Sequence, residues 1–182
     1  MKTKRKIVIA LTGIFVFLFI LAYYHGVFVT MHVKEKPAGG YILAGMEIKG
    51  PYAKVGTHMQ DLVEQLKNYG VSSERSFGIY YDNPEVVKPE NCRSFIGAVL
   101  EKDELTKIEN LKSAGFKLDS IPVKNSIEVV FPIKNSFSYM IGPKKAYPVL
   151  SKYIKEKKYT PDLTMEIYNN RTREIIFLMQ YH

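Results

Sequence analysis

The chain opens with an uninterrupted apolar run. Residues 7–24, IVIALTGIFVFLFILAYY, contain no charged side chain. A helix of about 20 apolar residues crosses the hydrocarbon core of a bilayer, so this run predicts a transmembrane helix. A cleaved signal peptide is the alternative, because a basic segment also precedes the apolar part of a signal sequence. The length of the run and the absence of a small-x-small cleavage site after it favour the anchor.

Beyond a polar linker predicted over 25–40, the apolar positions alternate between the helical and the strand period. Helical spacing predicts one amphipathic helix over 55–69, a short one over 103–112 and another over 146–158. The predicted strands occupy residues 41–49, 77–82, 92–100, 118–123, 126–133, 137–142, 163–170 and 173–181.

The same order of elements occurs twice. Gly50-Pro51 stands between a strand and a helix, and so does Gly142-Pro143. Each half is strand, helix, strand, strand, a unit that buries its apolar face only beside its copy. We therefore predict an α+β fold in which duplicated strand-helix-strand-strand units form one antiparallel sheet with two main helices on one face. A ligand would occupy the cleft between the repeats.

The predicted division of the chain starts with a basic segment at 1–6 and the transmembrane helix at 7–24. The linker at 25–40 and an α+β domain at 41–182 follow. Lys2, Lys4, Arg5 and Lys6 precede the helix. Because basic residues stay on the cytoplasmic side, we expect a cytoplasmic N-terminus and an exoplasmic domain.

Composition excludes several function classes. The formal net charge is +8, but basic and acidic residues are interspersed, which disfavours nucleic-acid binding. The only cysteine, Cys92, rules out an intrachain disulfide, and the four histidines show no ligand spacing. We expect no metal and no cofactor. The sequence lacks a catalytic-triad spacing and a glycine-rich phosphate loop, so an enzyme is not the first expectation.

Three motifs resemble the GyrI-like small-molecule-binding domain: Gly50-Pro51-Tyr52, Tyr80-Tyr81-Asp82-Asn83-Pro84 and Glu166-Ile167-Tyr168. Segments 79–100 and 153–158 are similar to the membrane-anchored branch of that superfamily, typified by a testis-expressed ER-phagy receptor. The resemblance implies a ligand-binding domain behind a membrane helix. The sequence ends at His182 without the tail of that branch, which leaves a membrane scaffold or receptor-like protein with unknown protein partners as an alternative.

Glu166 is the main candidate for ligand binding. It shares a strand face with Tyr168, and a carboxylate among aromatic rings suits a lipophilic cation. The resemblance implies the same role, since the matching glutamate of the family's regulators contacts cationic drugs. The alternative is a strand glutamate that is exposed or is paired with a nearby lysine. Alignment of the repeats through Tyr81 and Tyr168 puts Ile79 at the position equivalent to Glu166, so one carboxylate is expected in the cleft.

Tyr81, Tyr52 and Tyr139 complete the predicted ligand site. For Tyr52 and Tyr139, and also for Tyr80, packing in the core is the alternative. A small-molecule ligand and the membrane are the predicted partners. Some GyrI-like proteins resemble hydrolases that open strained electrophiles with a glutamate and tyrosines. Glu166 as base with Tyr81 as proton donor is therefore a further alternative.

Overall fold

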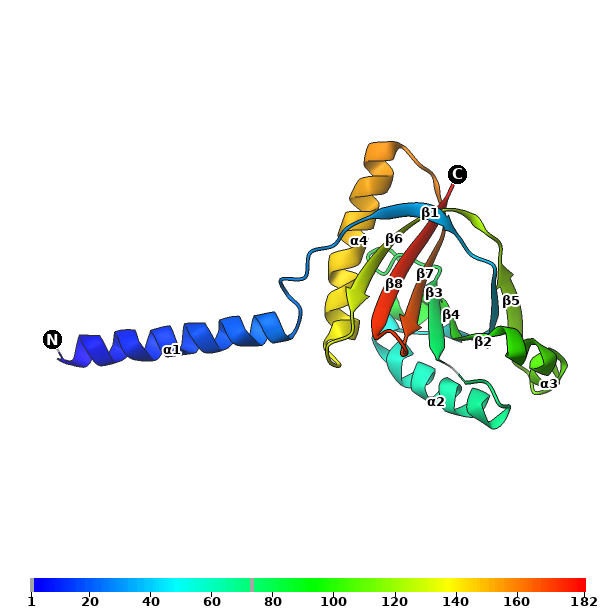
Figure 1. The fold of residues 1–182 in the computed structure, drawn as a ribbon, viewed down its shortest axis with the longest axis horizontal. Coiled ribbons are helices and arrows are strands. Elements are labelled where there is room, and N and C mark those ends of the chain that lie inside the picture. Colours follow the sequence, from blue (N-terminus) through cyan, green and yellow to red (C-terminus); the bar gives the residue numbers. More distant parts are fainter. Residues whose placement is uncertain (1, 73) are drawn as a thin grey trace.

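The computed structural model describes residues 2–72 and 74–182. Helix α1 (Lys2–Tyr24) projects from the rest of the molecule, which forms one α+β domain (Figure 1). The part of α1 from Thr3 to Tyr24 contains an 18-residue stretch with a mean hydropathy of 2.6, none of which is buried, so the helix is long and apolar enough to cross a membrane.

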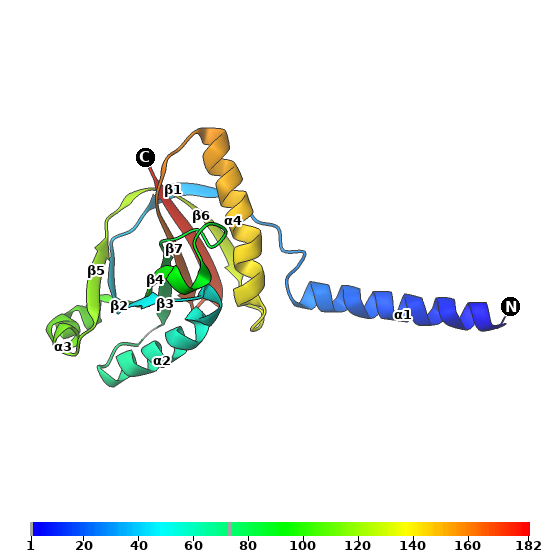
Figure 2. The same ribbon diagram turned by 180° about the vertical axis from the view of Figure 1, so that it is seen from behind.

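The described residues form an eight-stranded antiparallel sheet in the order β1-β6-β8-β7-β3-β4-β2-β5. The strands are β1 (Lys34–Ala38), β2 (Tyr41–Lys49), β3 (Arg75–Tyr80), β4 (Arg93–Val99), β5 (Lys117–Ile121), β6 (Lys124–Pro132), β7 (Pro161–Asn169) and β8 (Glu174–Tyr181). The helices of the domain are α2 (Val55–Asn68), α3 (Ile108–Ser113) and α4 (Ser138–Lys157), with short 3-10 turns η1 (Tyr52–Lys54), η2 (Pro89–Asn91) and η3 (Lys102–Lys107). The sheet is strongly curled, and α2 and α4 lie outside the curl (Figures 1 and 2).

The predicted duplication is confirmed. The first unit, β2-α2-β3-β4, gives the strand order β2-β4-β3, and the second unit, β6-α4-β7-β8, gives β6-β8-β7. The units join where β3 pairs with β7, and Gly78 lies opposite Glu166 in that pairing. The two-residue period of strands puts Gly78 and Tyr80 of one unit on the same face as Glu166 and Tyr168 of the other.

Three apolar clusters hold the domain together. Helix α2 packs on β2 and β4 around Leu62, Leu66 and Ile96. Helix α4 packs on β6 and β8 around Leu150 and Phe177. The third cluster fills the inside of the curled sheet, and its fully buried side chains include Phe77, Phe95, Met165 and Ile167. The seam between the two units, on the helix side, lies between the first two clusters.

Helix α4 begins earlier than the sequence predicted. Residues 137–142 were expected to form a strand, but Ser138 already starts the helix, and Pro143 and Pro148 both lie inside it. Each proline removes one backbone hydrogen bond. Close packing on the sheet compensates: a Cβ at Gly142 would lie 3.1 Å from Phe177 Cζ, so a larger residue there would push the Phe177 ring aside.

Residues 25–40 were expected to form a linker, but residues 34–38 form β1. Lys36 pairs with Ser126 of β6 in the ladder, and its Nζ lies 2.7 Å from Glu128 Oε1. The buried carbonyl oxygen of Ala38 accepts a hydrogen bond of 2.9 Å from Gln180 Nε2. The polar side chains of β1 are typical of an exposed edge strand. The segment therefore lacks the apolar alternation from which strands are predicted.

Candidate ligand-binding site

Glu166 lies in the seam between the two repeats. Its neighbours Met165 and Ile167 fill the inside of the sheet, so the strand period directs Glu166 to the helix side. The side chain is 3% exposed. Tyr147 Oη of α4 donates a hydrogen bond of 2.6 Å to Glu166 Oε1, and Tyr168 Oη donates one to Oε2. Both carboxylate oxygens are therefore held by tyrosine hydroxyls.

A series of tyrosines extends from the carboxylate into the first repeat. Tyr80 Oη lies 3.2 Å from Tyr168 Oη. Because the Tyr168 proton is directed at Glu166, Tyr80 is the donor in this pair. The ring of Tyr52 packs edge-on against Tyr80 with centroids 4.9 Å apart. Tyr52 Oη is 3.0 Å from the carbonyl oxygen of Asp82 and accepts a 3.0 Å hydrogen bond from its backbone N–H, which fixes the ring.

Tyr139 forms the outer side of the cluster. It lies in the first turn of α4, its side chain is 45% exposed, and its ring centroid is 5.8 Å from that of Tyr168. The structure thus brings together four of the five predicted site residues, Glu166, Tyr168, Tyr52 and Tyr139. Tyr80 and Tyr147 belong to the same cluster. Tyr80 was left open between packing and a place in the cleft, and Tyr147 was not predicted. Tyr147 lies within the predicted helix over 146–158, three residues before the buried Leu150, and this helical spacing is the signal that could have placed it on the face toward the sheet.

Tyr81 lies apart from this cluster. It follows the end of β3, is 46% exposed and lines a different cavity of about 500 Å³ together with Glu47 and Arg93. The Arg93 guanidinium carbon is 6.0 Å from the centre of its ring. The repeat equivalent of Tyr168 is Tyr80 rather than Tyr81. A hydrolytic pair of Glu166 with Tyr81 is therefore not assembled.

Burial dominates the electrostatics of the cluster. It raises the pKa of Glu166, while the hydrogen bonds from Tyr147 and Tyr168 lower it by a smaller amount. Burial, followed by the nearby Glu166 charge, raises the pKa of both Tyr147 and Tyr168. The tyrosines thus remain neutral donors, and the charge of Glu166 is unfavourable without a cation.

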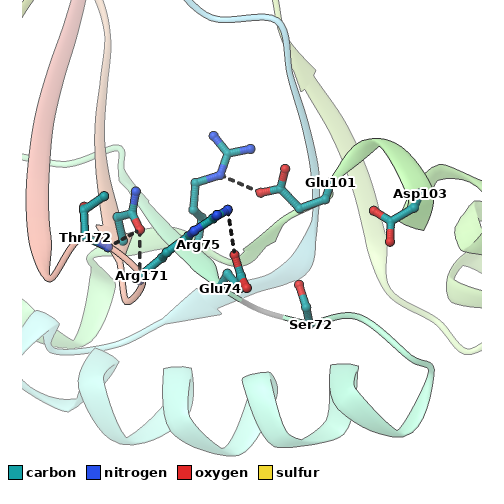
Figure 3. A pocket seen from close by; sticks show the side chains of 8 residues that line it. Ser72, Glu74, Arg75, Glu101, Asp103, Arg171 and Thr172 are labelled. Atoms are coloured by element: carbon teal, nitrogen blue, oxygen red, sulfur yellow. Dashed lines mark hydrogen bonds and ion pairs between the residues drawn. The ribbon is translucent and has the colours of Figure 1, made fainter.

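A second cavity, of about 760 Å³, lies away from Glu166 and is lined by Ser72, Glu74, Arg75, Glu101, Asp103, Asn169, Arg171 and Thr172. Figure 3 shows that its charged side chains face one another. Arg75 Nε is 2.7 Å from Glu101 Oε1, and Arg171 Nη1 is 4.0 Å from Glu74 Oε2. Because these charges compensate each other in an open, solvated hollow, the cavity has little to attract a ligand of one sign.

Fold and cluster together define a class: a duplicated α+β domain with a polar group buried in an aromatic seam, an arrangement suited to holding small molecules. The chain belongs to the family described as GyrI-like small molecule binding domain, which matches residues 30–175.

Two curated relatives are similar to part of this chain. The testis-expressed protein 264 homolog of Mus musculus is 34% identical over 100 residues, covering 52% of this chain and 32% of the mouse protein. Testis-expressed protein 264 of Homo sapiens is 33% identical over 99 residues, with coverage of 52% and 32%. The match thus spans about a third of the length of these relatives.

Solved structures share the fold at low identity. The crystal structure of the EcmrR C-terminal domain has a TM-score of 0.53 at 15% identity and covers 84% of this chain and 95% of that domain. The EcmrR protein in the cryo-EM structure of its DNA complex has a TM-score of 0.55 at 14% identity, covering 98% of this chain and 68% of EcmrR. At such identity the likeness supports the fold.

Proposed function

We propose that this chain is a membrane-anchored binding protein whose GyrI-like domain receives a small lipophilic cation at Glu166. One observation carries the proposal. Glu166 is 3% exposed, and none of the nine ion pairs found among the described residues includes it. Buried carboxylates are normally paired with a cation, and here the partners are two neutral hydroxyls.

A cationic ligand would supply the missing charge. Tyr168 is hydrogen-bonded to Glu166, and Tyr139 and Tyr80 contact Tyr168. A cation over the face of a tyrosine gains about 0.5–2 kcal/mol. An inorganic cation would have to give up its hydration shell at this site, and a single carboxylate does not compensate for that cost. An organic cation with apolar substituents avoids that cost and buries apolar surface as well.

The seam is closed in the present conformation, because the tyrosine rings fill it. Tyr139 is the ring with the fewest restraints: it is half exposed, whereas Tyr52 is fixed by backbone hydrogen bonds. We propose that rotation of Tyr139 opens the path to Glu166. This step is a side-chain rearrangement of the kind common at ligand sites.

Binding of a rhodamine dye to a fragment of residues 25–182 tests the proposal. By fluorescence anisotropy we expect micromolar affinity, which corresponds to about −8 kcal/mol. Glu166→Gln keeps the shape of the side chain and removes its charge. It should therefore weaken binding of the dye by about 1–3 kcal/mol, whereas binding of a neutral ligand of similar size should change little. Tyr168→Ala should weaken both ligands because it removes ring surface.

Glu128→Gln is the matched control. Glu128 is also a buried carboxylate on a strand, but its Oε1 is paired with Lys36 Nζ and it lies on the other face of the sheet. This variant should bind the dye with unchanged affinity. If Glu166→Gln and Glu128→Gln lose equal dye affinity, or if the wild type does not bind the dye, Glu166 is not a cation site. Either result would favour a scaffold role for the domain.

The anchor is the second part of the proposal. The length and hydropathy of α1 support a spanning helix, and Lys4, Arg5 and Lys6 at its start support a cytoplasmic N-terminus with an exoplasmic domain. Retention of the protein in membranes after an alkaline carbonate wash tests the anchor. Release into the supernatant, or a mature N-terminus beyond residue 24, would indicate a cleaved signal.

A further inference from the structure

The outward face of α4 carries a stripe that the ligand site does not use. At intervals of three or four residues, which align on one side of a helix, the exposed residues are Phe137, Met140, Lys144, Pro148, Ser151 and Lys155. Phe137 and Met140 are each 50% exposed. We call these six residues the α4 stripe. It is apolar at the start and basic further along.

Helix α4 lies on the side of the domain from which α1 emerges, and its exposed stripe points away from the sheet on which α4 packs. In both views α4 is the domain helix nearest to α1, and it runs across the direction of α1 (Figures 1 and 2). The two helices are tied at the start of α4. Asn135 Nδ2 donates to the Tyr24 carbonyl oxygen at 3.3 Å, Lys134 Nζ to that of Tyr23 at 3.4 Å, and the rings of His25 and Phe137 are 4.5 Å apart.

This arrangement determines how the α4 stripe lies relative to a bilayer that α1 spans. If α1 runs along the bilayer normal, α4 lies parallel to the membrane plane, with its stripe toward the surface. Phe137 and Met140, beside the end of α1, would reach the interface first, and the lysines would follow along the headgroups.

The charge of α4 suits an anionic surface. Its sequence, SYMIGPKKAYPVLSKYIKEK, contains five lysines and a single acidic residue, Glu156. Helices that lie in the membrane interface bring apolar side chains to the acyl-chain boundary and lysines to the headgroups, and α4 offers both kinds of residue to the surface. Each lysine close to an anionic bilayer strengthens binding on the order of five-fold, and the effect fades within about 8 Å at physiological salt.

We propose that the α4 stripe rests on the surface of the bilayer that α1 spans and binds its anionic phospholipids. This inference depends on the membrane anchor proposed above. It fixes the orientation of the domain: the seam with Glu166 opens at Tyr139, in the same turn of α4 as Met140, so the ligand site lies next to the bilayer surface.

The test uses the full chain in nanodiscs of phosphatidylcholine alone or mixed with phosphatidylserine. Met140→Cys and Ser151→Cys place thiols on the stripe, and Ser113→Cys places a matched thiol on α3, which lies at the far end of the domain from α1 (Figure 1). The native Cys92 is 1% exposed and gives the background. The rate of reaction with a water-soluble maleimide is measured at each position.

With phosphatidylserine present, we expect the two stripe thiols to react about ten-fold more slowly than Ser113→Cys, and high salt to restore the rate at Ser151→Cys. Adding Lys144→Glu and Lys155→Glu should remove the protection. Adding Lys102→Glu and Lys112→Glu changes the charge by the same amount beside α3. The stripe thiols should then remain protected.

Two failures are distinguishable. Equal rates at all three positions, in a protein that stays in the discs through a salt wash, would overturn the surface contact and leave the anchor intact. Loss of the protein from the discs would overturn the anchor and this inference with it.

Discussion

At the scale of residues, the two repeats differ where they meet. Gly78 and Glu166 face each other in the β3–β7 ladder, so one unit has no side chain where the other has the buried carboxylate. An added Cβ at Gly78 would lie 2.9 Å from Tyr80 Oη, which means that the ring of Tyr80 folds back over the glycine. The missing side chain makes room for the tyrosine that hydrogen-bonds Tyr168.

Gly78→Ala should therefore disturb the cluster. The new methyl group would push the Tyr80 ring away and break its hydrogen bond to Tyr168, at a cost of about 1–3 kcal/mol for overpacking. Urea unfolding measures the loss, and the rhodamine dye should bind more weakly. Gly56→Ala is the control, since a Cβ there meets no atom within 4 Å and alanine favours the helix. Unchanged dye affinity in Gly78→Ala would show that Tyr80 has no part in binding.

The raised pKa of Glu166 predicts how stability varies with pH. Because burial raises the folded-state pKa above its unfolded value, the folded state holds the proton more tightly, and stability is lost as the pH rises through the folded pKa. Glu166→Gln removes this dependence. The variant should gain stability relative to wild type between about pH 4 and neutral pH, with about 1.4 kcal/mol for each tenfold difference in proton affinity.

Urea unfolding of the wild type and of Glu166→Gln at acidic and neutral pH measures the difference in their free energies of unfolding. The titration of other groups cancels in this difference. Glu128→Gln is the comparison, because Lys36 already stabilises that carboxylate. A constant difference between Glu166→Gln and wild type across the pH range would mean that Glu166 does not titrate differently in the folded state.

At the scale of elements, the sequence predicted the α+β fold and the duplication because both depend on apolar periodicity. It missed β1 and the start of α4 because tertiary contacts decide them: β1 is polar and exists by pairing with β6, and α4 continues through Pro143 and Pro148 by packing on the sheet. Of the residues predicted for the ligand site, Glu166, Tyr168, Tyr52 and Tyr139 lie in one cluster, and Tyr81 lies outside it because of the strand register. In Tyr80-Tyr81 both residues are aromatic, so only the ladder decides which one faces Glu166.

The N-terminal boundary of the domain gives a prediction at this scale. Val29, Met31 and Val33 pack against the cluster beneath α4, and β1 covers the edge of β6. A fragment of residues 36–182 loses all three side chains and part of β1, whereas residues 25–182 keep them. The shorter fragment should be less stable by roughly 3 kcal/mol, at about 1 kcal/mol for each half-buried side chain.

Urea unfolding gives the stability of the two fragments, and size-exclusion chromatography detects association through the uncovered edge of β6. The longer fragment should be monomeric and unfold in one transition. Identical midpoints would mean that residues 25–35 contribute nothing to the domain.

At the scale of the whole molecule, charge at two places bears on orientation. Four basic residues lie at the start of α1, and five lysines lie on α4. The cytoplasmic leaflet is the more anionic one, so the lysines of α4 taken alone would suit a cytoplasmic domain. Orientation during insertion, however, depends on basic residues close to the ends of the spanning helix, and whole domains cross largely regardless of charge. Lys34 and Lys36, after α1, oppose the four at its start but are fewer and more distant.

We therefore expect the N-terminus in the cytoplasm and the domain on the other side. In sealed vesicles, an impermeant maleimide should reach Ser113→Cys only from the exoplasmic face, while wild type, whose Cys92 is 1% exposed, should stay unlabelled. Replacing Lys4, Arg5 and Lys6 by glutamate removes most of the basic cluster, so labelling should move to the cytoplasmic face. If Ser113→Cys with the native N-terminus is labelled only from the cytoplasm, the predicted orientation is wrong. Lys34, Lys36 and the basic face of α4 would then outweigh the basic residues before the helix.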